Sequence, residues 1–185
     1  TLTYPGAAPC NTTLQACITG AAGGDVVEIA TNTPVDEDLT INKSLTLRPA
    51  AGYSPTIGAG ASIRSVNFDD LGLPGDFQTL VVEGLNFNQA RIDGLVSEGA
   101  DHSVTIRNNI LFLEIDSNNT TAVKIDARVP MTGVVSGNRI TSIGQGIAAR
   151  AITAPAEAVD FLFERNVIDT SLPSQSNDGI ELDFR

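Results

Sequence analysis

A short sequence frame returns four times along this chain of 185 residues and constrains its fold more than any other feature. Each copy joins a β-branched or apolar run, a polar corner and a second apolar pair, which together describe a bent strand. By subtraction, the fifth positions of the copies are 24, 29 and 28 residues apart. Repeats of this length stack as the coils of a solenoid. The copies occupy residues 81–87, 105–111, 134–140 and 162–168, and their fifth positions are Leu85, Asn109, Asn138 and Asn166.

Short strands with alternating apolar residues fill the intervals between these frames. In the first coil we predict strands at residues 25–30, 38–41 and 44–47, in which apolar side chains recur at every second position. We place these three strands in one coil, with none of them pairing to another. The pattern predicts an all-β, single-stranded parallel β-helix of about five or six coils. We expect a single domain, with residues 25–185 as the solenoid and residues 1–24 as an N-terminal arm and cap.

The N-terminal segment carries the only sustained helical periodicity. Leu14, Cys17, Ile18 and Ala21 lie on one helical stripe, and glycines follow it. We predict Thr12 as the N-cap and Gln15 as its capping-box partner. A helix this short needs an apolar platform, so we expect it to cap the first coil. Residues 1–5 alternate polar and apolar side chains, which predicts a short strand outside the repeat.

The chain has two cysteines, Cys10 and Cys17, with six residues between them. Neither has a His or a third Cys nearby, so a zinc site is not expected. We favour a disulfide that holds the first helix and interpret the chain as a secreted or cell-surface protein. The alternative is two separate thiols, with Cys17 buried as a small apolar residue.

The charge balance excludes several partners. There are 11 Lys and Arg residues against 22 Asp and Glu residues, a net charge of −11. A surface of this sign repels nucleic acid and anionic lipid. No apolar run approaches the ~20 residues that span a bilayer. We therefore expect neither nucleic-acid binding nor membrane insertion.

Residues 13–57 resemble the opening of right-handed parallel β-helix proteins of the pectin-lyase-like superfamily. The shared features are a capping helix, a Gly-Asp strand start, the run Ile41-Asn42-Lys43-Ser44-Leu45-Thr46-Leu47 and a later Pro-Thr-Ile. The resemblance implies a right-handed helix. It also implies that Asn109, Asn138 and Asn166 form an internal asparagine ladder, whose amides hydrogen-bond from coil to coil. It implies little about function, because this fold carries lyases, hydrolases, adhesins and tailspikes.

A search for catalytic patterns assigns no catalytic residue. The one histidine, His102, lacks the glycine neighbours of the hydrolase motif, and we interpret it as a solvated corner residue. Arg107, Arg139 and Arg165 lie near the frame at different positions, with no aspartates in register beside them. We therefore expect no enzyme and no cofactor. For Ca²⁺ the candidate ligands are weak, and solvated loop charges are the favoured reading; they are Asp36, Asp38, Asp69 and Asp70.

We expect an exported, non-catalytic β-helix with a structural or adhesive role outside the cell. The C-terminal edge at residues 179–184 has no recognisable cap, and exposed parallel edges recruit strands. We therefore predict self-association in which residues 1–4 of one subunit pair with this edge of the next; the alternative is that the arm packs on its own first coil. The alternative function is a polysaccharide-active or carbohydrate-binding fragment, with its site in further coils or in the loop at residues 69–78. The predicted assembly residues are Thr1, Leu2, Thr3, Tyr4, Ile180, Leu182 and Phe184.

Overall fold

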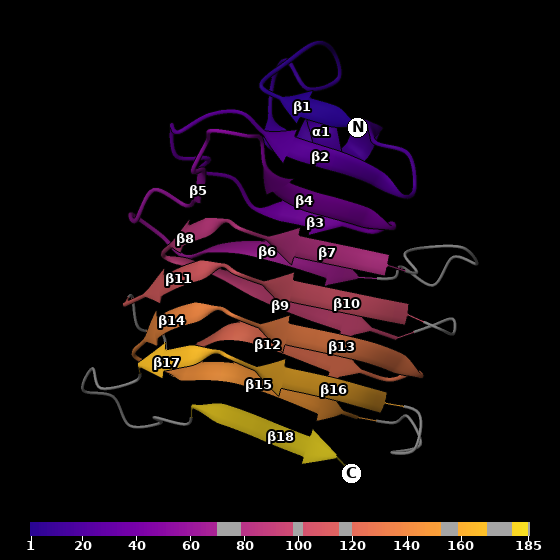
Figure 1. Cartoon of the computed structure of the whole chain (residues 1–185), viewed down its shortest axis with the longest axis vertical. Helices are drawn as coiled ribbons and strands as arrows, with labels where there is room; N and C mark the ends of the chain where they lie inside the picture. Colours follow the sequence, from indigo (N-terminus) through magenta and orange to yellow (C-terminus); the bar gives the residue numbers. More distant parts are fainter. Residues whose placement is uncertain (70–78, 98–101, 115–119, 153–158, 170–178, 185) are drawn as a thin grey trace.

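The computed structural model of the chain is a parallel β-solenoid of about five turns with one short helix at its N-terminal end (Figure 1). It describes residues 1–69, 79–97, 102–114, 120–152, 159–169 and 179–184. The predicted fold class is thereby confirmed. Within the described residues, no helix has the length and apolarity needed to cross a membrane.

Three parallel sheets form the walls of the solenoid, and each turn of chain passes from sheet A to sheet B to sheet C (Figure 1). Sheet A contains β1 (Leu2–Tyr4), β2 (Asp25–Ile29), β4 (Leu45–Pro49), β7 (Thr79–Glu83), β10 (His102–Arg107), β13 (Met131–Ser136) and β16 (Val159–Glu164). Sheet B contains β5 (Thr56–Ile57), β8 (Asn86–Asn88), β11 (Ile110–Leu113), β14 (Arg139–Ser142) and β17 (Val167–Asp169). Sheet C contains β3 (Leu39–Ile41), β6 (Arg64–Asp69), β9 (Ala90–Val96), β12 (Thr121–Ala127), β15 (Gln145–Ala151) and β18 (Ile180–Phe184).

The core is a set of columns in which each inward side chain lies over its counterpart in the next turn. In sheet A one column is built by direct register between successive strands and is buried until it reaches the last strand. Burial of such aliphatic side chains contributes about 1.5–3 kcal/mol each. The period-two alternation in the sequence therefore translates into a continuous apolar interior. The column consists of Val27, Leu47, Val82, Ile106, Val135 and Phe163.

The polar corner of the repeated frame is a two-residue turn from sheet A to sheet B. Its first residue has a positive φ in every copy: Gly84 (69°), Asn108 (55°), Gly137 (63°) and Arg165 (54°). Glycine adopts this conformation at little cost and asparagine tolerates it, which explains the polar, glycine-rich corner. The second turn residue points into the solenoid, where the asparagines of three successive turns stack.

At the turns, the side chains of the stacked asparagines accept the hydrogen bonds of backbone N–H groups from the neighbouring turn of the solenoid. Oδ1 of Asn138 accepts hydrogen bonds from the backbone N–H (3.0 Å) and the side-chain amide (3.1 Å) of Asn109. Asn166 repeats both bonds one turn later with Asn138, at 3.1 and 3.0 Å. Leu85 ends the series, because its N–H donates to Oδ1 of Asn109 at 3.0 Å. The buried turn is therefore satisfied by side chains rather than by water.

The helix α1 (Leu14–Gly20) closes the N-terminal end of the core, as predicted, with Leu14, Cys17 and Ile18 buried. The predicted cap residue was wrong by one position. Thr13 is the N-cap, because its hydroxyl accepts from the N–H of Ala16 at 3.0 Å. Cys10 and Cys17 form a disulfide.

Polar side chains from the first turn hold this helix in place. Gln15 does not complete a capping box; its amide instead accepts from the N–H of Thr40 (2.7 Å) and donates to the carbonyl of Thr40 (3.2 Å). The side chain of Gln15 thus bonds to the backbone N–H and carbonyl at the edge of β3, as a neighbouring strand would. Glu37 accepts from the first N–H groups of the helix, and Lys43 donates to carbonyls at its end. These charges complement the helix dipole.

The predicted boundary of the first coil was wrong. Residues 25–29 and 45–49 lie in the same sheet, with Asp25 opposite Leu45, rather than on two walls of one coil. By subtraction this first turn takes 20 residues, fewer than the later turns. Its sheet B side is reduced to a single bridge between Val35 and Ile57, so sequence periodicity alone offered no middle strand there.

Candidate functional site

Helix α1 covers the N-terminal end of the solenoid, whereas no described residue covers the last turn at the other end (Figure 1). Among the described residues, no strand pairs with the outer edges of β16, β17 and β18. Ile180 and Leu182 lie in register with the buried Ile147 and Ala149, so they face the core side of sheet C. They are nevertheless 45 % and 50 % exposed. The open end therefore combines unpaired strand edges with incompletely covered core residues.

The two predicted halves of the assembly edge lie at opposite ends of the molecule. Leu2, Thr3 and Tyr4 form β1, which pairs in parallel with Val27 to Ile29 of the first turn. The nitrogen of Thr1 lies 3.2 Å from Oδ1 of Asp25. Within one chain, the arm thus packs on its own first coil, and its outer edge has no strand partner among the described residues. Ile180, Leu182 and Phe184 lie on β18, paired with β15.

Two of the candidate cation ligands, Asp36 and Asp38, are already bonded to other residues of the protein. Both carboxylate oxygens of Asp36 bind Arg64, at 2.8 and 3.0 Å, and Asp38 accepts from the N–H of Ser65 at 2.9 Å. The hydrogen bond from Arg64 lowers the pKa of the Asp36 carboxyl. Asp69 ends β6, while Asp70 and the rest of the loop at 70–78 lie outside the described residues. The described part of the chain contains no cluster of three or more His, Cys, Asp or Glu residues suited to a metal ion.

The interpretation of His102 as solvated was wrong. It is the first residue of β10 and is buried, with 3 % of its surface exposed. Its position at the start of a strand suggested a corner, but β10 extends to that end of sheet A alongside Met131 of β13.

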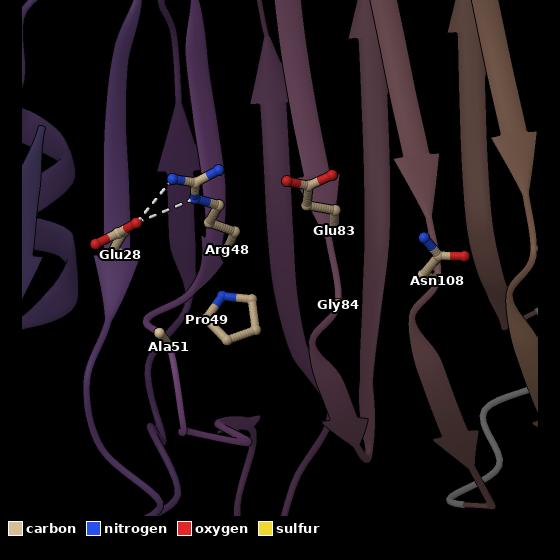
Figure 2. Close-up of a pocket in the computed structure, with 7 residues that line it drawn as sticks. All are labelled: Glu28, Arg48, Pro49, Ala51, Glu83, Gly84 and Asn108. Carbon is tan, nitrogen blue, oxygen red and sulfur yellow. Dashed lines mark hydrogen bonds and ion pairs between the residues drawn. The ribbon is translucent and has the colours of Figure 1, made fainter.

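The outer face of sheet A carries a row of alternating charges beside the asparagine turns. Arg48 donates to Glu28 at 2.8 and 3.2 Å, and Arg107 donates to Glu83 at 2.6 Å. A hollow of about 360 Å³ lies next to this row. Figure 2 shows residues that line it, with Glu28, Arg48 and Glu83 above Gly84 and Pro49. Each of these charges is engaged by its neighbour in the row. Solvent-exposed pairs of this kind contribute ~0–1 kcal/mol each, so we interpret the row as a stabilising feature.

On the outer face of sheet C, in contrast to sheet A, long charged side chains stand around a hollow of about 510 Å³. Direct register places Asp93, Lys124, Ala148 and Glu181 in one row across β9, β12, β15 and β18. Ala148 is the small member of this row, and the larger side chains stand around it. We call this hollow the sheet C groove; its lining residues are Arg91, Asp93, Thr121, Lys124, Gln145, Arg150 and Glu181.

Two networks, one of ion pairs and one of hydrogen bonds, hold the walls of the sheet C groove. In the first, Asp93 lies 3.2 Å from Arg91, and Lys124 lies 3.8 Å from Asp93 and 2.7 Å from Asp126. In the second, Thr121 donates to Gln145 at 2.9 Å, and both Gln145 and Arg150 donate to Glu181. Among the described residues around the groove, three buried polar atoms have no hydrogen-bond partner: Nε of Arg91, Nε of Arg150 and Oδ1 of Asp126.

The sequence analysis missed the sheet C groove because it considered Arg107, Arg139 and Arg165 rather than Arg91 and Arg150, which line the groove. Arg107 belongs to the sheet A row, and Arg139 and Arg165 lie on exposed turn and strand positions. A signal was present in the repeated tetrapeptides Arg-Ile-Asp-Gly (91–94) and Lys-Ile-Asp-Ala (124–127). The structure stacks them two positions out of alignment, so that Lys124 lies opposite Asp93 rather than Arg91. That offset converts two like charges into an ion pair.

Fold and geometry together define this chain as a parallel β-solenoid with a capped N-terminal end. A scan against protein families, a search of curated proteins and a search of solved structures each found no match. Membership of the pectin-lyase-like superfamily therefore remains a resemblance carried by the residues and motifs described above.

Proposed function

We propose that this protein is an exported, non-catalytic β-solenoid with a structural or adhesive role outside the cell, and that it self-associates end to end. One observation carries the proposal: in the described part of the chain, the core-facing Ile180 and Leu182 of the last turn are about half exposed, beside three parallel edges that have no strand partner there. Such edges bind further strands readily. The disulfide fits an oxidising compartment outside the cytoplasm.

The partner that best fits the open end is a second copy of the chain, shifted along the solenoid axis. All strands of sheet A run in parallel, with β1 at one end of the sheet and β16 at the other. The β1 strand of the next copy therefore has the correct direction to extend sheet A beyond β16. Leu2 and Tyr4 pack against the core cluster, as do Phe161 and Phe163, so the inward apolar column continues across the junction.

This geometry replaces the predicted partner of the arm, the edge at residues 179–184, by β16, because β1 and β16 belong to the same sheet whereas β18 belongs to sheet C. The arm keeps its own pairing with β2 and offers its outer edge, so no strand needs to leave its subunit. A head-to-tail contact of this kind leaves a free end on every copy and builds filaments unless the rotation closes a ring.

The proposal is tested by Leu182→Lys, with Leu162→Lys as the matched control. Leu162 is 51 % exposed on the outer side of β16, whereas Leu182 is equally exposed on the core-facing side of β18. Covering the exposed half of a leucine is worth about 1 kcal/mol, and burying an ammonium there adds a larger cost. We expect Leu182→Lys to weaken association at least about tenfold, which corresponds to 1.4 kcal/mol, while the control associates normally.

The measurement is sedimentation velocity over a range of protein concentrations, with electron micrographs of the concentrated samples. Unchanged melting temperatures of the two variants show that the fold is intact. A wild-type protein that stays monomeric at every concentration, or an equal loss of association in both variants, contradicts the proposal.

Contact with a polysaccharide is a second candidate function. It is favoured by the sheet C groove, whose volume of about 510 Å³ lies within the ~300–1,000 Å³ that is usual for ligand sites. Its walls are polar side chains held in place by one another, as recognition of a hydroxylated ligand requires.

A further inference from the structure

We propose that the sheet C groove binds uncharged sugar residues, which accept hydrogen bonds from its arginine and lysine side chains and donate to its carboxylates. This inference rests on the second candidate function and names its substrate class. It is independent of self-association.

Each cation of the groove is paired with a carboxylate, one of which, Asp126, lies outside the lining, and this pairing disfavours an ionic ligand. Three cations, Arg91, Lys124 and Arg150, are matched by the carboxylates to which they are paired, those of Asp93, Asp126 and Glu181. An anion would have to displace one of these carboxylates, and it would approach a chain of net charge −11. A cation would meet three positive side chains. A neutral ligand meets neither barrier.

The polar groups that the groove exposes suit hydroxyl groups. Arg91 and Arg150 bring N–H donors, and Asp93 and Glu181 bring carboxylate acceptors, all on partly exposed side chains that line the groove. A ligand that bonds to both kinds of group must donate as well as accept. A hydroxyl does both, and a sugar ring presents several on one edge. One class of ligand therefore complements both kinds of group.

Accessibility and rigidity fit the same conclusion. The side chains of Arg91, Lys124, Arg150 and Glu181 are about one third exposed, with values of 37 %, 32 %, 34 % and 32 %. Their outer atoms can reach a ligand while their ion pairs hold them in position. Asp126 is only 10 % exposed and anchors Lys124 from below. Side chains already ordered in this way lose little entropy on binding.

The lining also limits the mode of binding. None of its seven residues is aromatic, so a sugar ring cannot stack on a flat side chain there. The ligand is held by its hydroxyl edge, and binding is expected to be weak for a single site.

The test is a nuclear magnetic resonance titration of the ¹⁵N-labelled protein, a method suited to weak binding. The probes are cellotetraose, mannotetraose, galactotetraose and, as the charged counterpart, tetragalacturonate. We expect at least one neutral tetrasaccharide to shift amide signals in β9, β12, β15 and β18. Tetragalacturonate should bind at least about tenfold more weakly.

A pair of charge-conserving double variants assigns the effect to the groove. Arg150→Gln with Glu181→Gln removes one wall of the groove, and we expect at least a tenfold loss of affinity. Arg107→Gln with Glu83→Gln removes a matched pair from the outer face of sheet A and should leave affinity unchanged. If the first variant alters the fold, Lys124→Met on the opposite wall provides the same comparison.

The outcomes separate the two levels of the argument. Tighter binding of tetragalacturonate at the same strands overturns the inference about neutral sugars and leaves polysaccharide contact standing. Shifts confined to other strands, or no shifts with any of the four probes, overturn both.

Discussion

Replacing Asn138 by alanine should be among the most destabilising single changes in this chain. Its side chain takes part in four hydrogen bonds inside the solenoid. Oδ1 accepts two from Asn109, while the amide donates to the carbonyl of Ile106 at 2.9 Å and to Oδ1 of Asn166 at 3.0 Å. The residue is buried, with 1 % of its surface exposed, so water cannot replace these partners.

The size of the effect follows from which groups lose their only side-chain partner. The side-chain amide of Asn109 still bonds to Val82, and Asn166 still accepts from the N–H of residue 138. The N–H of Asn109 and the carbonyl of Ile106 are left buried without the amide of Asn138. Each such orphan costs roughly 1–3 kcal/mol, so for the two we expect a loss of about 2–6 kcal/mol in the free energy of unfolding.

The assay is urea denaturation followed by circular dichroism, with Asn67→Ala as the control. Asn67 is also a strand asparagine, but it is only half-buried, and its amide donates to the hydroxyl of Ser65 at 2.8 Å. We expect that variant to lose about 1 kcal/mol or less. A cost of Asn138→Ala below about 1 kcal/mol, or one equal to that of Asn67→Ala, would refute the argument that the stacked amides carry the turns.

Two further predictions concern the N-terminal end. Cys10 and Cys17 are 7 positions apart, and replacing both by serine opens the loop that their disulfide closes. Because the unfolded chain then gains entropy, the free energy of unfolding measured by urea denaturation should fall by about 2.5 kcal/mol. A double variant that is as stable as the oxidised wild type would contradict this. For pH, the hydrogen bond from Arg64 lowers the pKa of Asp36 below the unfolded value of about 3.9, so its contribution to stability is present above that value and is lost as pH falls through the folded pKa. Carboxyl titration by nuclear magnetic resonance should show this lowered pKa and its return towards the ordinary value in Arg64→Gln, whereas an unchanged pKa in that variant would rule out Arg64 as the cause.

Much of the architecture was predictable because it rests on local regularities. The alternation of Val27 and Ile29, or of Leu45 and Leu47, requires a strand with one buried face whatever surrounds it. The helical stripe of Leu14, Cys17 and Ile18 likewise required an apolar platform.

Errors arose where a residue's role depends on its neighbour in the next turn. The extent of β10 decides that His102 is buried, and no local pattern around it says so. Thr12 and Thr13 are equally good caps by composition, and the bond to Ala16 selects the second. Gln15 has the spacing of a capping box, yet the edge of β3 offers it two backbone partners instead.

The sequence by itself determined a coiled, parallel, all-β chain, because repeat period, side-chain alternation and turn chemistry are properties of consecutive residues. Only the tertiary structure decided which charges meet. A shift of two residues between β9 and β12 places Lys124 over Asp93. Between β15 and β18 the register sets Glu181 opposite Ala148, where Arg150 of β15 reaches it at 3.2 Å. A shift of two residues keeps the same side chains on the buried face, so the alternation in the sequence does not distinguish one register from the other. Register between turns, which consecutive residues do not encode, therefore built the sheet C groove.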